Sequence, residues 1–216
     1  MPRNLARDAQ EMERRKNQLI QAGFELFSRK GIENVSLQVV AETADVGIAT
    51  VYNYYQNKVN LVVAISTKIW TEVWKNEIQQ VGVEKSRELN AYEAIEFYAD
   101  TMIRLYQNRP EVLCFSSNYK TYICREDAPE ESISAHIDAL APIEKLFRER
   151  YERAKTDGSI RTDIPVEDMF STVTLTMLGM AERYAQSLVW AKKDDRDYVR
   201  ELQYTKDMLL AWVSKK

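Results

Sequence analysis

The sequence is poor in the residues that build small metal, redox and disulfide sites. It has only 2 cysteines, Cys114 and Cys124, which form no CxxC pair, and a single histidine, His136. These counts exclude zinc ribbons, thioredoxin-type centres and HExxH metalloproteases. Phosphate-binding loops of the GxGxxG and GxxxxGK[ST] types do not occur either. We therefore expect no metal and no cofactor.

Long uncharged stretches are also missing. The longest one runs only from Met169 to Ala181, whereas a membrane-spanning helix needs about 20 apolar residues. The N-terminus has no apolar core of signal-peptide length. With 6 glycines and 5 prolines among 216 residues, the chain is poor in turn residues, which disfavours many-stranded β folds. We expect a cytoplasmic protein that does not associate with a membrane.

The composition is otherwise that of an ordinary globular protein with little net charge. Hydrophobic residues make up 45% and charged residues 29%, and the formal net charge is −3. Residues 1–65 hold 8 basic and 7 acidic side chains, so bulk charge does not by itself indicate nucleic-acid binding. Arg14, Arg15 and Lys16 place positive charge near the start of the chain. A solvated helix face is their default interpretation, and DNA contacts are the alternative.

Apolar residues recur at helical spacing almost throughout the chain. Asn90 with Glu93 forms a capping-box pattern that opens one of the helices. Residues 81–89 are expected to form a loop, and Pro142 should either kink its helix or mark the true start of it. No strand pattern or repeat occurs. The sequence predicts an all-α protein of about nine helices: 8–29, a short helix after Ser36, 48–55, 58–80, one from 90, one over 112–123, one ending near 155, 166–191 and 196–213.

Residues 36–55 carry the most specific local pattern. Two short helices are separated by about three residues, which is the helix-turn-helix arrangement. The small Ala41 permits the second helix to cross closely, and Asp45 lies where the chain must turn, in a left-handed conformation that Asp tolerates. Val40 and Val51 supply inner apolar positions. For this pattern alone, a short αα turn without DNA binding remains the alternative.

The residues around this motif resemble the TetR family of transcriptional regulators. The matching positions are Gly31 to Ser36, Val40 to Tyr55, Asn57, Lys58 and Leu61. Four positions depart from the family pattern: Val35, Asp45, Gly47 and Ala49. The resemblance implies an N-terminal three-helix helix-turn-helix DNA-binding domain over residues 1–60, with the motif at about 36–55. It further implies an all-helical effector-binding and dimerisation domain over residues 61–216.

The geometry of the DNA major groove assigns roles to the second short helix. Its first turn should face the base edges, Asn53 suits adenine, and the Tyr52 hydroxyl suits a phosphate. Ser36 also suits a phosphate, and the resemblance adds Lys58 as a phosphate contact. A solvated surface position remains the alternative for Asn53 and Lys58, whereas Tyr55 is expected in the core. The predicted DNA-binding residues are Ser36, Gly47, Ile48, Ala49, Thr50, Tyr52, Asn53 and Lys58.

The rest of the chain contains no recognisable motif, but its apolar residues suggest two sites. One set would suit a pocket for an apolar or aromatic ligand: Tyr98, Met102, Phe115, Tyr119, Tyr122 and Met177. Glu96 and Asp100 lie near these residues and would favour a cationic ligand. The last two helices would pair with their copies in a four-helix interface through Met180, Tyr184, Leu188, Leu202, Leu209 and Trp212. Internal core packing remains the alternative for both sets.

We therefore expect a homodimeric transcriptional repressor that binds double-stranded DNA at an inverted-repeat operator and is released by a small-molecule effector. An activator of the same fold, and a helical protein-interaction module without DNA binding, remain alternatives. Two short patterns found in enzymes occur, SxxK at Ser117–Lys120 and YxxxK at Tyr54–Lys58. About one match to each is expected by chance, and neither has its partner motifs. We expect no catalytic residues and no enzyme activity.

Overall fold

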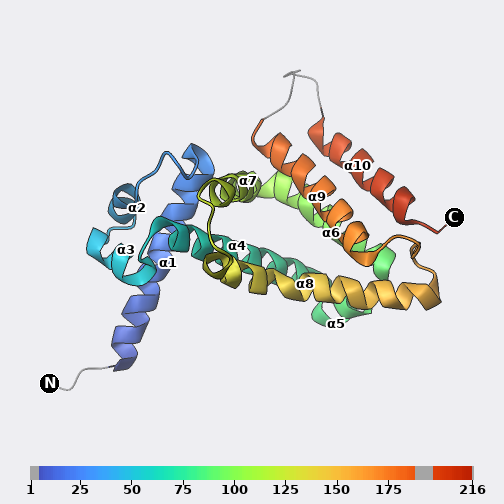
Figure 1. The fold of residues 1–216 in the computed structure, drawn as a ribbon, viewed down its shortest axis with the longest axis horizontal. Coiled ribbons are helices and arrows are strands. Elements are labelled where there is room, and N and C mark those ends of the chain that lie inside the picture. Colours follow the sequence, from blue (N-terminus) through green and yellow to red (C-terminus); the bar gives the residue numbers. More distant parts are fainter. Residues whose placement is uncertain (1–4, 188–196, 216) are drawn as a thin grey trace. The chain divides into compact units, whose positions relative to one another are not determined.

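The computed structural model describes residues 5–187 and 197–215 (Figure 1). Within these ranges it contains ten α-helices and no strand, which confirms the all-α class. The helices are α1 (Leu5–Lys30), α2 (Leu37–Thr43), α3 (Ile48–Tyr55), α4 (Lys58–Val81), α5 (Val83–Glu88), α6 (Ala91–Asn108), α7 (Pro110–Arg125), α8 (Glu130–Asp157), α9 (Val166–Ala185) and α10 (Tyr198–Val213). None of these described helices has the length and apolarity that crossing a membrane requires.

The chain divides into two compact units. The first unit contains residues 1–69 and 115–137, and the second contains residues 70–114 and 138–216. Helices α4, α7 and α8 each begin in one unit and end in the other, so both units combine segments that are far apart in the sequence. The boundary near residue 60 that the sequence suggests for the DNA-binding domain stays a prediction.

The first unit has a core contributed by α1, α2, α3 and the start of α4. Its fully buried side chains include Leu19, Phe27, Val40, Val51 and Leu61. Part of α7 completes this core, because the rings of Phe24 and Phe115 meet edge to face with centroids 5.6 Å apart. The Asn118 side-chain amide also donates to the Phe27 carbonyl at 2.9 Å. The N-terminal helices therefore pack against a segment that follows them by about 90 residues in the sequence.

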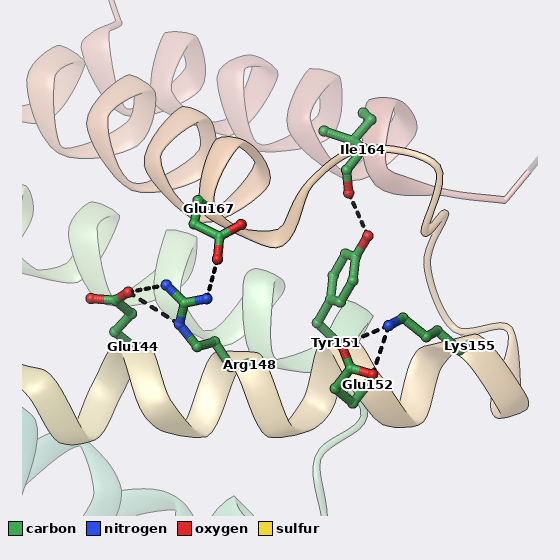
Figure 2. A network of polar contacts seen from close by, with 7 residues as sticks. All are labelled: Glu144, Arg148, Tyr151, Glu152, Lys155, Ile164 and Glu167. Atoms are coloured by element: carbon green, nitrogen blue, oxygen red, sulfur yellow. Dashed lines mark hydrogen bonds and ion pairs between the residues drawn. The ribbon is translucent and has the colours of Figure 1, made fainter.

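The second unit has a core formed by α6, α8, α9 and α10. Its fully buried members include Ile95, Met169 and Val213. Polar contacts join α8 to the segment that leads into α9. The Tyr151 hydroxyl donates to the Ile164 carbonyl, and Arg148 bridges the carboxylates of Glu144 and Glu167 (Figure 2).

Most helix ends fall where the local signals place them, but the segment between α4 and α6 differs from the prediction. The cap at Ser36 and the capping box at Asn90 and Glu93 are confirmed. The predicted loop 81–89 is wrong, because α5 occupies most of it: Gly82 turns the chain with φ 93, and good helix formers follow. Pro142 lies inside α8 and does not mark its start. Helix α9 ends at Ala185, and positions 188–191 of the predicted helix lie outside the described residues.

Candidate nucleic-acid interface

The chain makes a sharp turn between α2 and α3, as the sequence predicts. The Ser36 hydroxyl accepts from an amide in the first turn of α2 at 3.3 Å. At the other end of α2, Asp45 adopts φ 54, which confirms its left-handed conformation. The Asp45 amide donates to the Glu42 carbonyl at 3.2 Å, and the Val46 amide donates to the Ala41 carbonyl at 3.0 Å. This pair of bonds is a Schellman motif, whose left-handed position usually holds glycine.

Helix α3 has one buried and one exposed face. Val51 and Tyr55 are buried and fix the helix to the core of the first unit. The predicted DNA contacts lie on the remaining surface. Gly47, Ala49, Tyr52, Asn53 and Ser36 are exposed, and Ile48 and Thr50 are half-buried. The small residues around the start of α3 are thus at the surface, while their contact with DNA stays a prediction.

A polar depression borders the N-terminus of α3. Its lining residues are Arg14, Arg15, Gln18, Asp45, Val46, Gly47 and Thr50. Glu11 accepts from both arginines, with its Oε1 2.7 Å from Arg14 Nη2 and 2.9 Å from Arg15 Nε. The hydrogen bonds from Arg14 and then from Arg15 lower the pKa of Glu11 to about 2. The sequence favours a plain surface role for these arginines. The structure places them beside the start of α3, which helical periodicity alone does not reveal.

Asp45 is the position at which backbone strain and charge can be separated. Asp45→Gly is expected to raise the free energy of unfolding by about 1 kcal/mol, because glycine adopts positive φ without a Cβ penalty. It should also tighten DNA binding by about two- to fivefold at low salt, because a carboxylate is removed from a surface that would face phosphates. Urea denaturation and fluorescence anisotropy with operator DNA measure the two effects.

The matched variant is Asp45→Asn, which tolerates the left-handed region but carries no charge. It should tighten DNA binding as much as Asp45→Gly does, and it should leave the free energy of unfolding nearly unchanged. Equal DNA affinity of wild type and Asp45→Asn would contradict the placement of this carboxylate at the DNA surface.

Lys58 begins α4 beside two aromatic rings of the first unit. Its Nζ lies 5.9 Å from the centroid of the Phe27 ring and 5.5 Å from that of Tyr122, both within the range of cation–π attraction. Burial lowers the pKa of the Lys58 ammonium, and the charges of Glu126 and Glu33 oppose this effect. The rings therefore hold the stem and head of Lys58 at the start of α4, and its phosphate contact stays a prediction.

The second unit contains a largely apolar cavity of about 90 Å³. Side chains from α4, α5, α6, α8 and α9 line it. Its aromatic lining residues are Trp74, Phe97, Tyr98, Phe147 and Phe170. The Trp74 and Tyr98 rings are stacked, with centroids 5.9 Å apart and planes 18° apart. This cavity is suited to an apolar molecule that contains a ring.

Only Tyr98 of the predicted ligand-binding residues lines this cavity. The other five are buried core residues, two in the second unit and three in the first: Met102, Met177, Phe115, Tyr119 and Tyr122. Glu96 and Asp100 have oxygens 3.7 and 2.8 Å from Lys206 Nζ. One lysine thus engages both carboxylates within the protomer and neutralises part of their charge, which weakens the reason to expect a cationic ligand there.

Helices α9 and α10 pack against each other, and each leaves large apolar side chains exposed. Leu175, Tyr204 and Met208 expose 65%, 58% and 73% of their surface, and we call these three residues the α9–α10 apolar surface. The predicted interface residues lie elsewhere on the two helices. Tyr184, Leu202 and Leu209 are buried within the protomer, Met180 and Trp212 are half-buried, and Leu188 lies outside the described residues. The exposed apolar residues of the two helices therefore differ from the residues predicted for the interface, and the interface stays a prediction.

Side chains that could hold a metal ion do not gather in the described part of the chain. No group of three or more His, Cys, Asp or Glu residues has that arrangement among the described residues. Burial, and then the charge of Lys120, lower the pKa of His136 to about 4. The imidazole is therefore neutral at pH 7 and adds no positive charge to the first unit.

An exposed helix-turn-helix on an all-helical fold is typical of DNA-binding transcriptional regulators. Residues 19–65, which contain the motif, match the family model described as bacterial regulatory proteins, tetR family. The comparisons support a TetR-family transcriptional regulator, as the resemblance implied.

Individual relatives agree with this assignment. The HTH-type transcriptional repressor KstR of Mycolicibacterium smegmatis is 26% identical over 160 residues, which cover 72% of this chain and 68% of that protein. KstR of Rhodococcus jostii is 25% identical over 216 residues, which cover 99% of this chain and 90% of that protein. The transcriptional regulator FadR from Bacillus subtilis, solved in complex with stearoyl-CoA, shares the fold. Its TM-score is 0.65 at 14% identity, over 91% of this chain and 98% of that one.

Proposed function

We propose that this regulator is a homodimeric repressor that binds an inverted-repeat operator through α3 and releases it when a small molecule binds the second unit. The observation that carries the proposal is the exposed start of α3, where Gly47 and Ala49 present little bulk and no charge. A helix turn of this kind can approach base edges closely in the major groove. The two KstR relatives are named as transcriptional repressors, which favours repression over activation.

The limited charge of the DNA-facing surface supports a dimer. Arg14, Arg15 and Lys16 lie beside α3 and Lys58 begins α4, and Glu11 and Asp45 oppose these cations. Because affinity from counterion release grows with each neutralised phosphate, one copy alone would bind weakly. Pairing of the α9–α10 apolar surface with its copy about a two-fold axis would bring two α3 helices to one operator.

Helix α4 offers a route from ligand to DNA. Its first residue is Lys58, and further along it Trp74 and Ile78 line the cavity of the second unit. A ligand that favours one position of α4 would therefore also favour one position of Lys58 and of the neighbouring α3. The FadR complex with stearoyl-CoA supports an apolar effector for this fold.

Selection of bound duplexes from random DNA, with the full chain as bait, tests the operator. We expect an inverted repeat whose half-site centres lie about one helical turn of DNA, roughly 10 base pairs, or a multiple of it apart. Failure to enrich any inverted repeat contradicts a sequence-specific dimer.

The double variant Tyr52→Ala/Lys58→Ala tests the phosphate contacts. It should weaken binding of the selected operator by about tenfold or more, and lower the salt dependence by about two phosphates per dimer. Fluorescence anisotropy at several salt concentrations measures both quantities. Lys75→Ala removes an exposed lysine from α4 in the second unit and is the control. A salt slope that is equal in both variants would remove the proposed role of Lys58, and equal operator affinity would remove that of Tyr52 as well.

A further inference from the structure

One buried cation lines the cavity of the second unit. Arg150 of α8 exposes only 8% of its surface. Its Nε donates to the Leu89 carbonyl at 3.1 Å, and its Nη2 donates to the Ser86 carbonyl. Among the described residues, no carboxylate lies within ion-pair distance of this guanidinium. The direct partners of this positive charge are therefore the two carbonyls at the end of α5, and the negative charge of Glu149 acts on it only from beyond ion-pair distance.

Arg148 shows how different this arrangement is. It lies on the same helix, is more exposed, and binds the carboxylates of Glu144 and Glu167 (Figure 2). A guanidinium has five N–H donors, and the two carbonyls use two of those of Arg150. Burial, and then the nearby charge of Arg153, lower the pKa of Arg150. The charge of Glu149 opposes this shift without forming an ion pair. A buried charge without a directly paired counter-charge is unfavourable, and an anion in the cavity would relieve this.

The hydroxyl groups that line the cavity already have partners for their protons. The Ser86 hydroxyl donates to a carbonyl of α5 at 2.8 Å. The Tyr98 hydroxyl donates to the Thr174 carbonyl at 3.0 Å, and the Thr174 hydroxyl donates to a carbonyl one turn earlier in α9 at 2.7 Å. Beside the Trp74 indole N–H, Arg150 is thus the lining side chain with donors left to fix the polar end of a ligand, and it is the one that carries a positive charge among the lining residues.

We propose that this cavity binds an apolar, ring-containing carboxylate, with the carboxylate on Arg150 and the rings among the aromatic side chains. The proposal rests on the effector role of the second unit and names the class of effector. Two carboxylate oxygens match the planar fork of a guanidinium, and aromatic walls favour a ring. The cavity of about 90 Å³ is several times larger than the roughly 10–15 Å³ that one water molecule requires.

Isothermal titration calorimetry with cinnamate and cinnamamide tests the proposal on the full chain. The two probes have the same ring and chain and differ in the charge of the head group. Wild type should bind cinnamate about tenfold to a hundredfold more tightly than cinnamamide, because charge-assisted hydrogen bonds are the stronger ones. Equal affinity for the two probes, or tighter binding of the amide, overturns the proposal without any variant.

Two variants locate the preference at one side chain. Arg150→Gln keeps hydrogen-bond donors without the charge, so it should keep its cinnamamide affinity and lose the preference for cinnamate. Arg148→Gln, on the same helix, should retain the full preference. If Arg150→Gln does not fold, Arg150→Lys should keep a reduced preference, because a point charge replaces the planar fork. A preference that survives unchanged in the folded Arg150 variant overturns the assignment.

Two further arms separate this inference from the proposed function. Cinnamoyl-CoA carries the same ring and chain but no carboxylate at the acyl end. Tighter binding of this thioester, unaffected by Arg150→Gln, would overturn the free-acid assignment. Release of operator DNA is measured separately by anisotropy. Binding of cinnamate through Arg150 without DNA release would support the ligand class and contradict effector release. DNA binding without cinnamate binding would agree with the proposed DNA-binding function and overturn the ligand class.

Discussion

Replacing Ala49 by glutamate is expected to abolish operator binding, with an affinity loss of at least about a thousandfold. Ala49 is exposed in the first turn of α3, so each protomer would bring a carboxylate against the base edges and the phosphates beside them. Like charges placed together at an interface weaken binding by several kcal/mol, and a dimer would carry two such contacts. Fluorescence anisotropy with the selected operator measures the loss.

The fold should survive this change, because glutamate in the first turn of a helix interacts favourably with the helix dipole. Thermal melting followed by circular dichroism checks this expectation. Gln79→Glu is the matched control: it adds the same charge at an exposed position of α4 in the second unit. DNA binding by Ala49→Glu that equals binding by Gln79→Glu would contradict the placement of α3 in the major groove.

The helix-turn-helix could be predicted because its signals are local. Ser36 caps the helix that directly follows it, and the left-handed conformation of Asp45 is needed to end that helix. Both features depend on bonds between residues a few positions apart. The exposed and buried sides of α3 follow from the same spacing, which places Val51 and Tyr55 inside and Ala49 outside.

The cavity could not be predicted because it depends on packing between distant segments. Arg148, Arg150 and Arg153 look equivalent in the sequence. Only Arg150 is buried, with its guanidinium on the Ser86 and Leu89 carbonyls, whereas Arg153 reaches the Leu89 carbonyl from an exposed position. Helix α5 itself has no apolar stripe, and its one buried residue is Ser86. Helical periodicity therefore has nothing to detect in α5, and the segment that Arg150 contacts is the one that the sequence predicts as a loop.

The interface residues illustrate the same limit on a helix pair. Helices α9 and α10 are apolar on more than one side, so periodicity marks both the inner and the outer positions. Leu209 is buried and Met208 is exposed, although the two are adjacent in the sequence. Which side faces the protomer's own core is decided by α6 and α8, not by α10 alone.

The double variant Leu175→Glu/Met208→Glu is expected to convert the proposed dimer to a monomer. In a two-fold interface each carboxylate meets the same patch of the partner, so four new charges would enter an apolar contact. Analytical ultracentrifugation should show one monomeric species at micromolar concentration. Operator affinity should fall by at least about a hundredfold, because each half-site would be bound separately.

Val83→Glu is the control for this effect, since it places the same charge on an exposed apolar residue of α5. It should leave both the oligomeric state and operator affinity unchanged. The melting temperature of the wild type should rise with protein concentration, because dimerisation stabilises the folded state, and that of the double variant should not. A double variant that remains dimeric would exclude the α9–α10 apolar surface as the interface. A monomer that keeps full operator affinity would instead show that one α3 suffices, and would remove the need for two half-sites.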